Sequence, residues 1–189
     1  MVSDALILGF DTSAAHCAAA LLSGDRCIAA AAEDMRQGQA ERLFPLLESL
    51  LNEVGADWGD LSRIGVGVGP GNFTGIRISV SAARGLALSL GVPAIGVSTF
   101  EAIEAASDHL PAVRGPRDQV YLARPGCAPS LEIEAQVQQA LAFPPTPAQL
   151  AQNIARRAAL AVPGPAPAPL YVRAADAAPA RDTAPAILT

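Results

Sequence analysis

The sequence predicts an α/β fold in which a mixed sheet carries helices on its faces. Short apolar runs are typical of buried strands, apolar residues repeat at helical spacing between them, and glycine and proline residues mark the boundaries. Taken in order, residues 1–108 predict the series β-β-β-α-β-α-β-α. The later strands follow helices, so crossover connections should place them parallel to their neighbours.

The first predicted strand, residues 5–10, is a continuous apolar run that ends at Asp11, Thr12 and Ser13. Residues 17–22 and 26–32 flank the turn Ser23-Gly24-Asp25 and predict a hairpin beside that strand. Open α/β sheets hold ligands at the carboxyl ends of their strands, which makes Asp11 a candidate for holding a hydrated magnesium ion or orienting a water molecule. The alternative is that its carboxylate caps the following turn.

Residues 64–77 predict a strand, a glycine-rich turn and the start of a helix. Backbone N–H groups at such a turn can bind phosphate or another anion, although the P-loop lysine is missing. The alternative is that the glycines permit close packing of the helix on the strand. Arg77 in the first helical turn favours binding, because a cation there is unfavourable without a neighbouring anion. The candidate contact residues are Asp11, Thr12, Ser13, Gly69, Gly71, Asn72, Thr74 and Gly75.

An amphipathic helix is predicted for residues 39–54, followed by helix 76–90, strand 94–97 and a helix through residue 106 that begins with an S-x-x-E capping box. The apolar stripe of the first helix normally packs on a sheet, while its Ala40, Glu41, Arg42 and Glu48 leave other faces for a partner. Its apolar positions are Leu43, Leu46, Leu47, Leu50, Leu51 and Val54.

After residue 108 the patterns are weaker. Residues 118–123 predict a strand, 131–142 a strand or a helix, 147–160 a helix, and 170–173 an edge strand. Beyond Val162 the chain is rich in proline and alanine, which does not favour packed structure. We therefore expect an N-terminal domain of residues 1–108 and a reduced second domain of residues 109–189.

Composition narrows the classes of function. The chain has 13 basic and 18 acidic side chains and 51% hydrophobic residues, so its overall charge should repel nucleic acid. Its three cysteines match no zinc-site spacing, His16 has no partner histidine, and no basic segment precedes the first apolar run. These features indicate a cytoplasmic protein without a metal, and no apolar run is long enough to span a bilayer.

The element order, with Asp11-Thr12-Ser13 after the first strand, resembles one half of the actin-like (ribonuclease H-like) ATPase and sugar-kinase superfamily. Residues 7–13, 39–51, 69–77 and 91–99 are similar to the TsaB (YeaZ) family, accessory subunits for threonylcarbamoyladenosine modification of tRNA. The similarity covers nearly all of the first domain and returns weakly at residues 169–173.

The resemblance implies a subunit with no catalytic residues and no cofactor. It would pair with the actin-like transferase TsaD, and through it with the ATPase TsaE, and would reach tRNA only through that complex. Without its partner the chain would form a homodimer. Carried over to this sequence, the partner-binding helices would offer Arg42, Leu43, Leu46, Leu47, Leu50, Ile76, Arg77, Val80 and Arg84.

Two other classes of function stay open. In a small-molecule kinase or ATPase, Asp11 would hold magnesium and the loop from Gly69 to Gly75 would hold phosphate. However, no second phosphate loop follows residue 110. Separately, the second domain departs from the TsaB family pattern, because Arg114 stands where that pattern has an acid before Val120 and Tyr121. A protease could be suggested by Ser13, His16 and Asp11, but nothing in the sequence orients a base toward a nucleophile.

Overall fold

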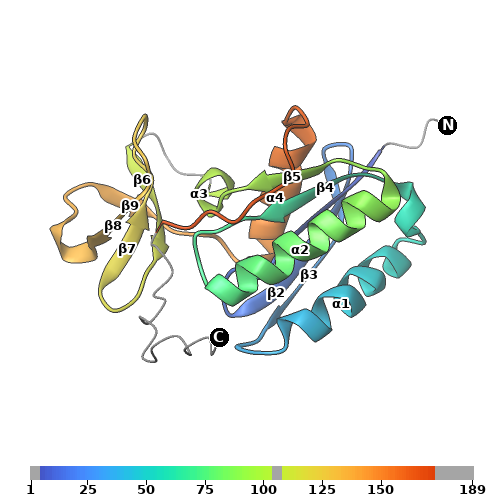
Figure 1. Cartoon of the computed structure of the whole chain (residues 1–189), viewed down its shortest axis with the longest axis horizontal. Helices are drawn as coiled ribbons and strands as arrows, with labels where there is room; N and C mark the ends of the chain where they lie inside the picture. Colours follow the sequence, from blue (N-terminus) through green and yellow to red (C-terminus); the bar gives the residue numbers. More distant parts are fainter. Residues whose placement is uncertain (1–4, 104–107, 173–189) are drawn as a thin grey trace, which may run out of the picture.

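A five-stranded mixed sheet forms the centre of the computed structural model, which describes residues 5–103 and 108–172 (Figure 1). Its order is β3-β2-β1-β4-β5, with β1 antiparallel to β2 and parallel to β4. The mixed sheet and the order of its elements confirm the sequence-based prediction. The strands are β1 Leu6–Asp11, β2 His16–Ser23, β3 Arg26–Asp34, β4 Leu61–Gly67 and β5 Ala94–Val97.

Helices cover both faces of this sheet (Figure 1). Helices α1 (Gln39–Glu53) and α2 (Phe73–Leu90) pack on one face, and α4 (Pro147–Leu160) packs on the other. Successive strand residues point to opposite faces. Leu8 and Phe10 of β1 therefore join the core under α1 and α2, whereas Ile7 packs with Ala155 of α4.

Helix α4 lies very close to the sheet because two strand residues beneath it are glycines. A Cβ atom on Gly9 would lie 2.5 Å from the carbonyl oxygen of Ala151, and one on Gly65 would lie 2.8 Å from Cβ of Ala158. At the end of the helix, Nη1 of Arg63 donates hydrogen bonds of 2.6 Å to the carbonyl oxygens of Ala158 and Ala161. This arginine satisfies carbonyl groups that a helix C-terminus otherwise leaves open.

A second sheet of four strands lies beside the first, in the order β8-β7-β6-β9 (Figure 1). A small core of Ala112, Val120 and Leu122 holds it together. Its strands are β6 His109–Arg114, β7 Gln119–Leu122, β8 Ser130–Ile133 and β9 Ala140–Ala142. Short helices are η1 Trp58–Asp60, α3 Thr99–Ala102 and η2 Glu134–Gln136.

The second half differs from its sequence-based reading at several places. The helix over 147–160 is confirmed, but strand β6 was not predicted, and residues 131–142 form two short strands around η2. The capped helix α3 ends at Ala102, since Ile103 is extended. The rest of its predicted range, residues 104–106, lies outside the described part.

The expected edge strand at residues 170–173 is also wrong for its described residues. Leu170 donates one backbone hydrogen bond of 2.8 Å to the carbonyl oxygen of Val68, and no ladder follows it. Residues 161–172, called the strap below, instead run from α4 back across the first sheet (Figure 1). Arg173 lies outside the described residues. The domain boundary near residue 108 stays a prediction, with β6 starting at His109.

Within the described ranges, no helix combines the length and the apolar character needed to cross a membrane.

Candidate functional site

The carboxylate of Asp11, at the end of β1, is fully buried. Its Oδ2 atom accepts hydrogen bonds from the backbone N–H and the hydroxyl of Ser13, at 3.0 and 2.9 Å, and lies 2.7 Å from Nε2 of His16. The other oxygen, Oδ1, faces Gly67, where a Cβ atom would lie 1.9 Å from it. Asp11 thus organises the turn after β1, which supports the capping role that the sequence left open.

The trio of Asp11, Ser13 and His16 comes together, but not in the order of a hydrolytic triad. The hydroxyl of Ser13 donates to Asp11, and no hydrogen bond joins it to His16 among the described contacts. A serine nucleophile needs its hydroxyl on the imidazole, with the carboxylate behind the imidazole. The carboxylate stands in the centre here, so this arrangement does not activate Ser13.

The glycine loop packs directly against the turn after β1. Cβ atoms on Gly71 and Gly75 would lie 2.2 Å from the carbonyl oxygen of Ser13 and 1.9 Å from that of Thr12. Two hydrogen bonds join the same segments: Asn72 N–H to the Ser13 carbonyl at 2.6 Å, and Thr12 Oγ1 to the Gly75 carbonyl at 2.7 Å. The close-packing role of these glycines, which the sequence left as an alternative, therefore has direct structural support.

The start of α2 is capped within the chain. The side-chain oxygen of Asn72 accepts a hydrogen bond of 2.9 Å from the backbone N–H of Gly75, which satisfies one of the open donors of the first turn. Asp11, Thr12, Gly69 and Gly75 are buried, while Asn72 and Thr74 are exposed. The anion or nucleotide contact stays a prediction, and Asn72 and Thr74 are the residues that reach the surface.

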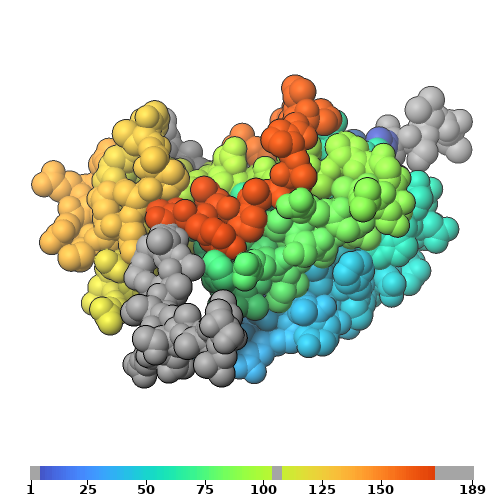
Figure 2. Space-filling model, viewed as in Figure 1, coloured from blue at the N-terminus to red at the C-terminus, as the bar shows by residue number. Residues whose placement is uncertain are grey.

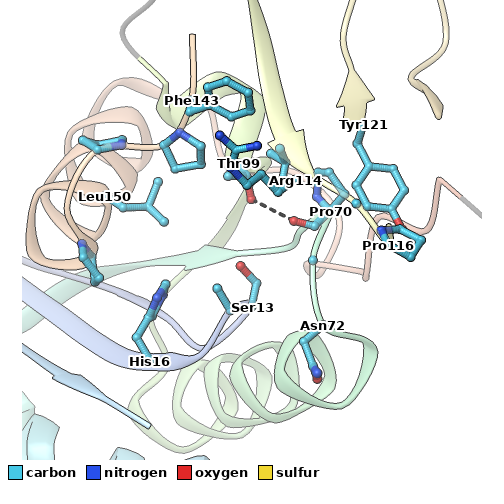
Figure 3. Close-up of a pocket in the computed structure, with 17 residues that line it drawn as sticks. Ser13, His16, Pro70, Asn72, Thr99, Arg114, Pro116, Tyr121, Phe143 and Leu150 are labelled. Atoms are coloured by element: carbon cyan, nitrogen blue, oxygen red, sulfur yellow. Dashed lines mark hydrogen bonds between the residues drawn. The ribbon is translucent and has the colours of Figure 1, made fainter. Parts of the chain in front are cut away.

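A cleft of about 510 Å³ opens between the turn after β1 and the second sheet (Figure 3). Ser13 and His16 lie on one side of it, and Arg114, Tyr121 and Phe143 lie on the other. Arg114 stacks over the ring of Phe143 at 4.4 Å from its centroid and donates a hydrogen bond of 3.1 Å to Glu134. Sequence reasoning missed these second-sheet residues, because no local pattern predicts which distant strand faces Ser13.

No metal-binding cluster is apparent in the parts of the chain that the structure describes. Residues 5–103 and 108–172 contain no group of three or more His, Cys, Asp or Glu side chains that could hold a metal ion. The Asp11–His16 pair therefore stands without a third ligand of this kind in those ranges.

A second hollow, called the α1–α2 groove below, lies between the two helices on the face of the sheet opposite α4. Its volume is about 770 Å³. Figure 2 shows α2 exposed along most of its length, with α1 on one side and the strap on the other. The residues that line the groove are Ala40, Leu43, Phe44, Thr74, Arg77, Ile78, Ser81, Ala82, Gly85, Leu86 and Ser89.

The structure corrects the apolar part of the expected partner-binding surface. These side chains face the sheet and are at most 4% exposed, because the stripe that makes each helix amphipathic packs into the core. The buried residues are Leu43, Leu46, Leu47, Leu50, Ile76 and Val80, of which Leu43 also lines the groove. Of the three expected arginines, Arg77 and Arg84 are exposed, and Arg42 is half-buried in an ion pair with Glu33.

Of the predicted contacts, Leu43 and Arg77 line the groove, and the other groove residues of α1 and α2 were not predicted as partner contacts. Phe44 is 42% exposed, and α2 contributes the small residues Ser81, Ala82 and Gly85. The sequence held a signal for Phe44, since it lies at the edge of the apolar stripe, one heptad before Leu51. Its ring also lies 6.4 Å from that of Trp58, and a half-exposed aromatic residue at such an edge favours a contact surface.

Several curated proteins and a family model are similar to this chain. The family model described as TsaD, tRNA N6-adenosine threonylcarbamoyltransferase, matches residues 33–141. The tRNA threonylcarbamoyladenosine biosynthesis protein TsaB of Bacillus subtilis is 38% identical over 120 residues, which cover 61% of this chain and 52% of that protein. TsaB of Escherichia coli is 38% identical over 94 residues, covering 50% and 40%. The chain thus spans about half the length of the curated relatives it matches.

A solved structure resembles the whole described fold. It is the crystal structure of an uncharacterized protein with similarity to peptidase YEAZ from Pseudomonas aeruginosa, with a TM-score of 0.74 and 25% sequence identity. The similarity covers 89% of this chain and 100% of that chain. These matches confirm the resemblance to TsaB (YeaZ) proteins that was read from the sequence motifs. Because the family model spans more than half of the 189 residues, this chain belongs to the family of TsaD, TsaB and YeaZ proteins.

Proposed function

We propose that this chain is a non-catalytic subunit of tRNA threonylcarbamoyladenosine biosynthesis that binds and activates a TsaD-type transferase. The observation that carries the proposal is the α1–α2 groove, which is largely apolar and open along two helices. The curated relatives are named for this biosynthesis, and the matched family model is that of the transferase. In this proposal TsaE and tRNA are reached through TsaD, in the cytoplasm, and the isolated chain pairs with itself.

Asp11 holds the turn after β1 through one of its two carboxylate oxygens, and its buried Oδ1 has no hydrogen-bond partner among the described residues. This carboxylate is the one that an actin-like ATPase would use at the end of β1, and here it is fully buried. Ser13 donates hydrogen bonds to its Oδ2 atom, and Nε2 of His16 lies within hydrogen-bond distance of the same atom. Its Oδ1 atom lies against the backbone of β4 at Gly67. A carboxylate held in this way is suited to stabilising the turn.

The composition of the groove suits a partner helix. On α2 the small residues Ser81, Ala82 and Gly85 line it, and small residues let another helix approach to the short end of the usual 8–10 Å range. On α1 the exposed ring of Phe44 can anchor the contact, since aromatic residues dominate the energetics of protein interfaces. Packing a partner helix here would form a helical bundle on one face of the sheet.

Gly85→Leu tests this proposal directly. A Cβ atom on Gly85 would meet nothing within 4 Å, so the leucine side chain enters the groove without disturbing the core. We expect the affinity for a TsaD-type partner to fall at least about tenfold, the effect of losing about 1.4 kcal/mol. The variant itself should be as stable as the parent or more stable by up to about 1 kcal/mol, because glycine is a poor helix former. Calorimetric titration measures the affinity, and thermal unfolding measures the stability.

Gly59→Leu is the matched control, since Gly59 is exposed in η1 and its Cβ position is also open. It should bind as the parent chain does. Two results would contradict the proposal: no association of the parent chain with a TsaD-type protein at micromolar concentration, or unchanged binding by Gly85→Leu. ATP turnover by the chain alone, abolished by Asp11→Asn, would instead support a kinase or ATPase.

A further inference from the structure

The exposed side of α2 carries a stacked column of side chains. The rings of Phe73 and Tyr171 lie 4.8 Å apart at an interplanar angle of 24°, and the guanidinium carbon of Arg77 lies 4.6 Å from the centroid of the Phe73 ring. Phe73 is 40% exposed and Tyr171 is 43% exposed. Stacking on both faces of Phe73 holds a cation and two aromatic groups in place at the protein surface.

The cations of this helix have no counter-charge among the described residues. Helix α2 contains Arg77 and Arg84 and no Asp or Glu, although the chain as a whole has a net charge of −5. No ion pair joins either α2 arginine to a described residue; among the described arginines, ion pairs are formed by Arg42, Arg114 and Arg124.

The column is continuous with the α1–α2 groove. Arg77 lines that groove and also a smaller hollow of about 410 Å³ on the other side of α2, beside Arg84 and Pro169 of the strap. No carboxylate lines either hollow. In Figure 2 the strap crosses the molecule directly beside α2. A helix seated in the groove would therefore meet this positive edge along its side.

We infer that Phe73, Tyr171, Arg77 and Arg84, called the arginine–aromatic column below, select an acidic helix of the partner protein. The inference rests on the proposed function and adds the chemistry of the partner. Arg77 and Arg84 stand two helical turns apart on one side of α2, about 10.5 Å along its axis. The matching helix carries apolar side chains toward the groove and carboxylates at a similar spacing toward the arginines.

The column suits this recognition because its guanidinium groups present planar pairs of donors that bind carboxylates in a bidentate way. Stacking orders Arg77 before the partner arrives, so less conformational entropy is lost on binding. Charge complementarity also sets specificity, since a basic partner helix would be repelled. RNA fits the surface less well, because the chain is acidic overall and the adjoining groove is apolar.

Charge reversal on α2 tests the inference. Arg77→Glu and Arg84→Glu should each weaken the binding of a TsaD-type partner at least about tenfold at low salt. The affinity of the parent chain should fall between 50 mM and 500 mM salt, whereas that of the double variant should rise, because salt screens the repulsion between its glutamates and the partner's carboxylates. Arg157→Glu is the control, because it makes the same charge change at an exposed residue of α4, on the opposite face of the sheet. Circular dichroism and thermal unfolding confirm that each variant is folded.

A second variant tests the aromatic part. Tyr171→Ala should weaken binding in the parent chain but have less effect when Arg77 is already alanine, because both residues act through the Phe73 stack. Equal effects in both backgrounds would overturn the role of the column as a unit.

The outcomes separate this inference from the proposed function. If Gly85→Leu blocks binding while both arginine variants bind like Arg157→Glu, the arginine inference is wrong and the docking function stands. If the parent chain does not bind a TsaD-type protein, both are overturned. Binding of tRNA by the chain alone, lost in the arginine variants while protein binding is unchanged, would overturn the acidic helix in favour of nucleic acid.

Discussion

Two glycines of α2 show how neighbouring atoms decide the role of a residue. Gly75 and Gly85 lie on the same helix, and both look equally unfavourable in a helical sequence. At Gly75 a Cβ atom would lie 1.9 Å from the backbone oxygen of Thr12, whereas at Gly85 it would meet nothing within 4 Å. Gly75 is thus needed for the contact between β1 and α2, and Gly85 leaves room on the surface.

Gly75→Ala and Gly85→Ala should therefore change stability in opposite directions. The first forces apart two backbone segments and should lower the free energy of unfolding by about 1–3 kcal/mol, as overpacking does. The second should raise it by up to about 1 kcal/mol, because alanine favours the helix. Urea unfolding of both variants measures the difference. Equal destabilisation would mean that helix propensity and close contact do not explain these positions.

At the scale of elements, the β7–β8 hairpin depends on one ion pair. Nη2 of Arg124 donates a hydrogen bond of 2.9 Å to Oε2 of Glu132, and Ser130 donates one of 2.7 Å to its other oxygen. The hydrogen bonds from Arg124, followed by that from Ser130, lower the pKa of Glu132 from 4.5 to about 2. The pair joins the segment just after β7 to the middle of β8.

Glu132→Gln should destabilise the chain in a pH-dependent way. A carboxyl group whose pKa is lowered by folding contributes stability above its unfolded pKa and loses that contribution as pH falls. The difference between the parent and the variant should be complete above pH 4.5 and should shrink steadily toward pH 2. Chemical unfolding at several pH values measures it. A difference that stays constant over this range would rule out the Arg124 pair as its cause.

On the scale of the whole molecule, α4 ties the two halves of the chain together. It follows the second sheet in sequence, yet it packs on the first sheet, over Gly9 and Gly65. Cys27 lies at the edge of this contact, beside Ala155, and burial raises the pKa of its thiol. Cys27 can therefore report whether α4 is in place.

Gly9→Ala should loosen α4, because the added methyl group would lie 2.5 Å from the Ala151 carbonyl oxygen. We expect faster alkylation of Cys27 at pH 8, with the exposed Cys127 of the same chain as the internal reference. Peptide mass spectrometry after a short iodoacetamide pulse measures the ratio of the two. Gly59→Ala, at an open position, should leave it unchanged. The same Cys27 to Cys127 ratio in both variants would show that Gly9 does not position α4.

By itself the sequence determined the elements whose signals are local. Apolar periodicity predicted the strands of the first sheet, helices α1, α2 and α4, and the glycine turn, because these patterns depend on residues a few positions apart. The motifs around Asp11 and Gly71 were specific enough to indicate the family. The same periodicity also placed the leucines of α1 on one face, but it could not say which face the sheet would cover.

Only the tertiary structure decided which surfaces stay open and which groups meet. The apolar stripes of α1 and α2 are buried in the core. The proposed docking surface therefore consists of Phe44, Gly85 and the arginines of α2. Likewise, α4 reaches the first sheet from more than a hundred residues away, and the strap brings Tyr171 onto Phe73. Such contacts depend on how segments far apart in the sequence pack together. Local patterns of side chains do not predict this packing.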